Sequence, residues 1–198
     1  CVQKDLKYIN AYSSVSHCSL VLFAILMMTQ TAITGAVLQM LSHGLMTALF
    51  FALIGMIYGR THTRDIREMS GLMKVMPFLS VCYVIAGLAN LGLPGLSGFV
   101  AEMTIFVGAF EVNDTFHRIL PIIATTSIVI TAVYILRLIG KILYGKVENP
   151  EHLKLTDATW DERLTLICLI VAIAGLGLMP FGISTMISDS VLAMQSTF

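Results

Sequence analysis

Five long apolar stretches constrain what this chain can fold into. About 20 residues of α-helix are needed to cross the hydrocarbon core of a bilayer, which is ~30 Å thick. Only 12% of the residues are charged, whereas about 25% is typical of a soluble domain. The sequence therefore predicts an all-α, polytopic membrane helix bundle that forms a single membrane domain over residues 1–198. The five predicted transmembrane segments lie near residues 12–33, 35–58, 77–110, 118–144 and 164–192.

The third predicted segment contains helix-breaking residues. As one continuous helix, residues 77–110 would be about 50 Å long, well beyond the ~30 Å core. This leaves either one helix that protrudes into water or two shorter helices joined by a break. The middle of the stretch is LGLPGLSGFVAE, in which the proline removes a backbone donor and the glycines permit an unwound backbone. We expect a discontinuous third segment with its break at Gly92, Pro94, Gly95 and Gly98.

The distribution of positive charge predicts the topology. If the five segments alternate in direction, residues 1–11, 59–76 and 137–163 lie on the same side of the membrane. Eleven of the twelve lysines and arginines fall in these three ranges, and Arg118 alone lies on the other side. Because cytoplasmic loops carry an excess of Lys and Arg, this side is predicted to be cytoplasmic, with loops at 59–76 and 145–163. An additional crossing within the third segment would remove this asymmetry.

Composition and motifs disfavour several other classes of protein. The formal net charge is zero, so nothing indicates a nucleic-acid partner. The four cysteines, Cys1, Cys18, Cys82 and Cys168, are far apart and show no metal-ligand spacing, so we expect reduced thiols and no metal site. No phosphate-cradling glycine loop, Ser-His-Asp arrangement or redox-cofactor motif is present. We therefore expect no cofactor bound in this chain.

Glu102 is an ionisable residue within the third apolar segment. A charged side chain at the centre of a membrane helix costs ~2.5–3.5 kcal/mol on insertion scales, and such residues commonly mark proton or ion pathways. Broken helices with ionisable groups beside the break are a feature of transporters. Two other interpretations remain: Glu102 extends to the headgroup region from a helix end, or it forms a buried structural ion pair. Apolar stretches of similar length flank the break, which argues against the headgroup interpretation.

His17 and His43 are two further candidates for proton transfer. Histidine titrates near neutral pH and can relay a proton after a small local shift. His43 lies one helical turn after Gln39, so these two side chains share a face of an otherwise apolar helix. Alternatively, each histidine is an interior polar group that holds neighbouring helices together. The presence of both histidines together with Glu102 and a broken helix favours a proton path.

Four segments of the sequence resemble a known family. In chain order they are DLKYINAYSSVSH, GAVLQMLSHGL, RTHTRDI and LGLPGLSGFVAEM, and they look like the proton-pumping, antiporter-like subunits of respiratory complex I. Multisubunit sodium/proton antiporters and membrane-bound hydrogenases share this fold. Two of the three paralogous complex I subunits usually have lysine at the position of Glu102, so the glutamate resembles the subunit M, or chain 4, branch. Cys18 and Ser19 depart from the methionine and glycine common in the family, which concerns packing alone.

The resemblance implies the fold and the residues that transfer protons. The family has about fourteen helices with two inverted five-helix repeats, each containing a discontinuous helix, and this chain would be its C-terminal part. His17 and His43 match histidines of the family's central hydrophilic axis. Glu102 matches the terminal carboxylate of the second broken helix. The implied function is proton translocation, as part of an NADH-quinone oxidoreductase in which this chain holds no redox site.

The resemblance also implies partners and cofactors. NADH, FMN, iron–sulfur clusters and quinone would be bound by partner subunits. The partners would be the other membrane subunits of complex I, including the paralogous antiporter-like ones, within a lipid bilayer. We expect a bacterial cytoplasmic membrane rather than the mitochondrial inner membrane. The alternatives are a subunit of a sodium/proton antiporter or of a membrane-bound hydrogenase, and a non-transporting membrane scaffold.

Overall fold

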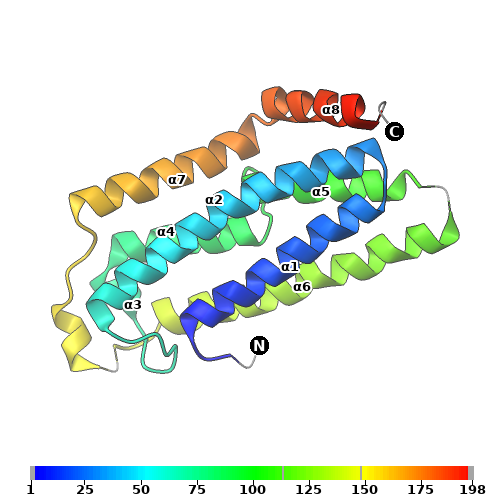
Figure 1. The fold of residues 1–198 in the computed structure, drawn as a ribbon. Coiled ribbons are helices and arrows are strands. Elements are labelled where there is room, and N and C mark those ends of the chain that lie inside the picture. Colours follow the sequence, from blue (N-terminus) through cyan, green and yellow to red (C-terminus); the bar gives the residue numbers. More distant parts are fainter. Residues whose placement is uncertain (1–2, 113, 148, 196–198) are drawn as a thin grey trace.

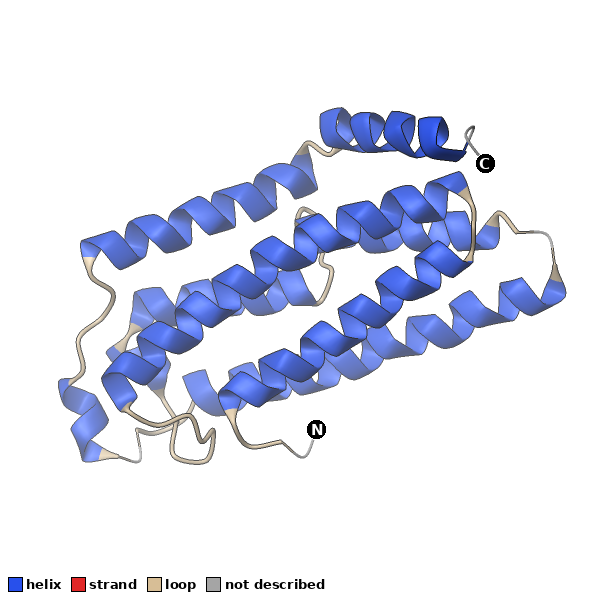
Figure 2. Cartoon of the chain, viewed as in Figure 1, coloured by secondary structure: helices blue, strands red, loops and turns tan. Residues whose placement is uncertain are grey.

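The fold is a bundle of α-helices. A computed structural model describes residues 3–112, 114–147 and 149–195, and within these ranges it contains helices, turns and loops but no β-strand (Figure 2). The prediction of an all-α bundle is therefore confirmed. The elements, labelled in Figure 1, are α1 (Leu6–Leu26), α2 (Gln30–Thr61), α3 (Leu72–Val75), α4 (Pro77–Asn90), α5 (Ser97–Phe110), α6 (Thr115–Leu143), the 3-10 helix η1 (Pro150–Lys154), α7 (Trp160–Leu178) and α8 (Phe181–Gln195).

Helix α2 runs through the middle of the bundle. It packs against α1 and α5 and also contacts α4, α7 and α8, so its apolar side chains Leu49, Leu53 and Ile57 are almost completely buried. Helices α1 and α2, together with most of α6, are long and apolar enough to cross a membrane. Helices α7 and α8 make a fourth candidate if they are taken as one bent span. Many large apolar side chains on the outside of the bundle are exposed, as expected for surfaces that face lipid.

The bounds of α1 and α2 differ from those of the first two predicted segments. Helix α1 starts at Leu6 and ends at Leu26, so a segment over residues 12–33 is wrong as a single helix. Met28 has a φ of 56°, and Thr29 caps α2 by accepting a hydrogen bond from the backbone N–H of Ala32 at 3.1 Å. This tight turn contains apolar residues, so hydropathy alone does not reveal it.

The third segment is discontinuous, as predicted. Helices α4 and α5 lie end to end (Figure 1), and the residues between them, 91–96, are not helical. Gly92 and Gly95 have positive φ values of 63° and 96° there. Gly98 was expected in the break, but it lies in the first turn of α5. A Cβ added to Gly98 would lie 2.8 Å from the backbone oxygen of Ala89, so this glycine permits close packing instead.

The last segment is bent. We expected one span near residues 164–192, but α7 and α8 meet at an angle of 69°. Pro180 cannot continue the helical hydrogen-bond pattern because it lacks a backbone N–H. Before this bend, α7 approaches the break in the third segment closely: a Cβ added to Gly177 would lie 2.5 Å from the backbone oxygen of Gly95. The end of α7 therefore supports the non-helical turn.

The ranges rich in Lys and Arg gather at one end of the bundle. Figure 1 shows the start of α1, the end of α2, α3 and the start of α7 at the same end. Arg60 joins two of these elements through a 2.5 Å ion pair with Glu162. In the loop after α2, the hydrogen-bonded Arg67 guanidinium lowers the pKa of Asp65 to about 2. This arrangement agrees with the charge pattern, while the sidedness of the loops at 59–76 and 145–163 stays a prediction.

Candidate functional site

The three predicted proton-transfer residues lie together inside the bundle. His17 comes from α1, His43 from α2 and Glu102 from α5. The exposed fractions of His17 and Glu102 are 6% and 8%, and His43 is half-buried. The three helices α1, α2 and α5 therefore place ionisable side chains in one interior cluster.

Glu102 points into the cluster from the first turns of α5. Its Oε1 lies 3.8 Å from Nδ1 of His17. Its Oε2 lies over the break, because a Cβ added to Gly92 would be 2.6 Å from this oxygen. The break thus accommodates the carboxylate in the interior of the bundle.

His17 has a hydrogen-bond partner at each ring nitrogen. Nε2 lies 2.5 Å from Oδ1 of Asn90, the last residue of α4. Nδ1 lies 2.9 Å from Nε2 of Gln39 on α2. Asn90 is itself held by Ser13 of α1, to which its Nδ2 donates a hydrogen bond at 2.9 Å. Partners on two other helices, α2 and α4, therefore fix the orientation of the imidazole.

His43 extends the cluster along α2. The centroids of its ring and that of His17 are 5.2 Å apart, with the rings tilted by 33°. Oγ1 of Thr47, one turn further on, lies 3.3 Å from Nε2 of His43. The polar side chains thus form a row from Thr47 through His43 and His17 to Glu102. Protons can pass along such a row where a water or a small side-chain movement connects neighbouring groups.

A small cavity adjoins His17 and Glu102. Its volume is about 10 Å³, which is close to the space that one water molecule needs. Its polar lining would give that water hydrogen-bond partners. The lining residues are Ser16, His17, Leu20, Asn90, Glu102, Ser127, Ile128 and Thr131.

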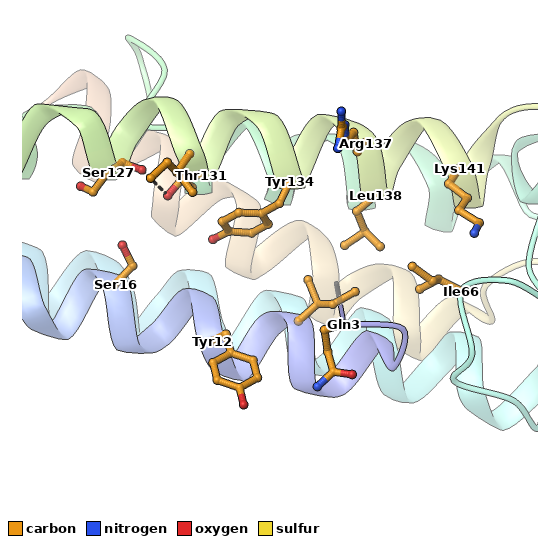
Figure 3. A pocket seen from close by; sticks show the side chains of 12 residues that line it. Gln3, Tyr12, Ser16, Ile66, Ser127, Thr131, Tyr134, Arg137, Leu138 and Lys141 are labelled. Atoms are coloured by element: carbon orange, nitrogen blue, oxygen red, sulfur yellow. Dashed lines mark hydrogen bonds between the residues drawn. The ribbon is translucent and has the colours of Figure 1, made fainter. Parts of the chain in front are cut away.

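A larger groove of about 780 Å³ runs between α1 and α6. Figure 3 shows Tyr12 and Ser16 on its α1 side, with Ser127, Thr131 and Tyr134 on its α6 side. The groove and the small cavity have three hydroxyl-bearing lining residues in common, namely Ser16, Ser127 and Thr131. Toward the positively charged end of the bundle, Arg137 and Lys141 line the groove (Figure 3).

Several residues of the site were not predicted. Asn90 and Ser13 hold His17 in place, and Thr131 lines the cavity. Asn90 does carry a signal in the sequence, since it is a polar residue within an apolar run directly before the break. Ser13 and Thr131 gave no comparable signal, because hydroxyl side chains are common in membrane helices, where they bond to the backbone of their own helix. Among the described residues, no group of three or more His, Cys, Asp or Glu side chains could hold a metal ion.

Comparison with known families identifies the class of protein. Residues 1–131 match the family described as NADH:quinone oxidoreductase/Mrp antiporter, TM. The chain therefore belongs to this family of membrane proteins, as the resemblance of its motifs suggested.

Individual relatives of this chain are named as chain 4 proteins. It is 42% identical over 185 residues to NAD(P)H-quinone oxidoreductase chain 4 1 of Trichormus variabilis, covering 90% of this chain and 35% of the relative. It is 37% identical over 197 residues to chain 4 2 of a Synechococcus strain, covering 97% of this chain and 37% of the relative. The chain thus spans about a third of the length of these relatives. Both relatives are cyanobacterial, which agrees with a bacterial-type membrane.

Solved structures show the same fold. A chain of respiratory complex I from Thermus thermophilus superposes with a TM-score of 0.88 at 26% identity, covering 96% of this chain and 39% of that one. A chain of the Mrp complex from a Dietzia species superposes with a TM-score of 0.83 at 17% identity, covering 96% of this chain and 43% of that one. The second similarity concerns the fold alone.

Proposed function

We propose that this chain is part of a proton-translocating membrane subunit of an NAD(P)H-quinone oxidoreductase, of the chain 4 type. The observation that carries the proposal is the buried contact at the helix break, where Oε1 of Glu102 lies 3.8 Å from Nδ1 of His17. An isolated ionisable group inside a membrane is unfavourable, whereas two groups that exchange a proton with each other and with water make a relay.

In this proposal the proton moves through the row of side chains in the cluster. His43 and His17 receive and pass on the proton, and Glu102 holds and releases it beside the break. The small cavity between Glu102 and Thr131 would hold a water that connects the carboxylate to its surroundings. Oxidation of the nicotinamide nucleotide and reduction of quinone would take place in partner subunits, which would bind FMN, iron–sulfur clusters and quinone.

Sequence similarity favours a quinone oxidoreductase over a sodium/proton antiporter. The chain is 42% identical to relatives named NAD(P)H-quinone oxidoreductase chain 4. Among the superposed structures it is 26% identical to a complex I chain and 17% identical to the Mrp chain. Glu102, in place of the lysine usual in antiporter relatives, supports the same choice. The proposed partners are accordingly the other membrane subunits of the oxidoreductase, including paralogous antiporter-like subunits.

The proposal is tested by Glu102→Gln in the assembled complex, reconstituted into proteoliposomes. We expect protons pumped per electron to fall strongly while the complex still assembles, because the amide cannot take up and release a proton. Dye-monitored proton uptake and quinone reduction, measured in the same vesicles, give this ratio.

Glu102→Asp is the matched control, since it keeps the carboxylate and should retain part of the pumping. Near-normal pumping by a well-assembled Gln variant would contradict the proposal. It would favour a non-transporting scaffold in which Glu102 and His17 are a structural pair.

A further inference from the structure

The side chain of Gln39 uses only one of its two polar atoms. Gln39 is 1% exposed, and its Nε2 lies 2.9 Å from Nδ1 of His17. Its Oε1 is also buried but has no hydrogen-bond partner among the described residues. A buried acceptor without a partner is unfavourable and calls for an explanation.

The present arrangement fits a His17 that carries one proton. Oδ1 of Asn90 can only accept, so Nε2 of His17 donates to it at 2.5 Å. Nδ1 of His17 then has a free lone pair, which accepts from the amide of Gln39. In this state the two nitrogens have complementary partners.

A second proton on His17 changes what the imidazole requires. The proton binds at Nδ1, which becomes a donor and faces the donor Nε2 of Gln39. Two acceptors can relieve this conflict. One is Oε1 of Gln39, brought to His17 by a half-turn of the amide. The other is Oε1 of Glu102, which lies 3.8 Å from the same nitrogen.

We propose that Gln39 is a positioning residue whose amide orientation decides whether His17 keeps its second proton or passes it to Glu102. With Nε2 toward His17, the imidazolium is disfavoured: the Nδ1–H bond breaks, an O–H bond forms on Glu102, and both groups end neutral. With Oε1 toward His17, the amide accepts from Nδ1–H and the proton stays. This inference rests on the proposed function, since it concerns the proton path through the same site.

Few titratable groups face His17. Glu102 approaches it from α5 and His43 from α2. From α4 it meets the neutral amide of Asn90, and from α6 the neutral hydroxyls of Ser127 and Thr131 in the small cavity. A carboxylate placed at position 39 would therefore be the nearest new charge to His17.

The test compares Gln39→Glu with Gln39→Met in the assembled complex, as proton pumping per electron over a range of pH. An ionised Glu at this position offers only acceptors and its negative charge stabilises the imidazolium of His17, so we expect the pH profile of pumping to move to higher pH by about one unit or more. Met fills similar space without hydrogen bonds, so we expect lower pumping without this alkaline shift. Gln30→Met is the control: Gln30 is at the start of the same helix, and its Nε2 donates to Ser188 at 2.9 Å, away from the site.

An alkaline shift in the Glu variant alone supports the inference. Pumping and pH profiles equal to those of the parent in both Gln39 variants overturn it. Equal losses in both variants without any pH shift also overturn it, since they indicate a purely structural residue. If Glu102→Gln abolishes pumping while the Gln39 variants behave as the parent, this inference fails and the proposed function stands. Normal pumping in Glu102→Gln overturns both.

Discussion

At the residue scale, the position of Glu102 depends on a glycine ten residues earlier. Gly92 has a φ of 63°, and a Cβ added to it would lie only 2.6 Å from Oε2 of Glu102, too close for both atoms to fit. A residue with a side chain here would be strained and would also displace the carboxylate. Gly95 shares the backbone requirement, with a φ of 96°, but its Cβ would meet only Cδ2 of Leu178 at 3.8 Å.

These two glycines allow backbone strain to be separated from displacement of the carboxylate. Both Gly92→Ala and Gly95→Ala should lower stability by about 1–2 kcal/mol, because alanine is unfavourable at positive φ. Only Gly92→Ala should also reduce protons pumped per electron, because it moves Glu102 away from His17. Thermal unfolding and vesicle pumping of both assembled variants measure the two effects. Equal pumping by the two variants would contradict the interpretation that Gly92 leaves space for the Glu102 carboxylate.

At the scale of elements, a residue in the linker before α7 caps the start of α4, the helix before the break. The first residue of α4 is Pro77, and Met76 before it gives no side-chain cap. Instead, the carboxylate of Asp157 accepts hydrogen bonds from the backbone N–H groups of Phe78 at 2.9 Å and Leu79 at 3.3 Å. These are donors that a helix start leaves without intrahelical partners. The other end of α4 carries Asn90, so this cap supports the site through the helix.

Loss of this cap should weaken the bundle measurably. Asp157→Ala removes both acceptors and is expected to lower stability by about 0.5–2 kcal/mol, the usual range for a lost helix cap. Asp157→Asn keeps one acceptor oxygen and should lose less. Thermal unfolding of the purified complex in detergent compares them, and an Ala variant as stable as the parent would show that the cap contributes nothing.

At the scale of the whole molecule, the bundle separates a charged end from an end with few charges. The connection between α5 and α6 lies at the opposite end from the connection between α6 and α7 (Figure 1). Exposed residues mark both ends, Asp114 in the first connection and Lys146 in the second. The charge pattern predicts that Lys146 faces the cytoplasm.

Sided labelling of introduced cysteines tests this topology. In inside-out vesicles, an impermeant thiol reagent should label Lys146→Cys and leave Asp114→Cys unlabelled, and right-side-out vesicles should give the reverse. The parent chain provides the background, because Cys18 and Cys168 are exposed on the outside of the bundle. Labelling of both positions from the same side would contradict a crossing by α6. Labelling of Asp114→Cys alone from the cytoplasmic side would contradict the single crossing by α4 and α5.

Part of this structure follows from the sequence and part only from tertiary packing. Apolar length and the Gly92–Pro94–Gly95 pattern are enough to predict the helix bundle and the broken segment, because the membrane requires helices and these residues interrupt them. The cost of an ionisable group in an apolar run likewise singles out Glu102, His17 and His43. The turn at Met28 and the bend at Pro180 did not follow, because both lie within apolar runs that hydropathy does not divide. The helical position of Gly98 did not follow, because it depends on close packing against Ala89.

Tertiary structure alone decided which polar groups meet. The contact of Glu102 with His17, the amides of Asn90 and Gln39 on the two imidazole nitrogens, and the cap from Asp157 all join residues far apart in the sequence. A periodic pattern indicates which face of a helix is polar, but not which neighbouring helix lies against that face. Hydrogen bonds act over about 3 Å, so the partners of each buried group are set by how the helices pack.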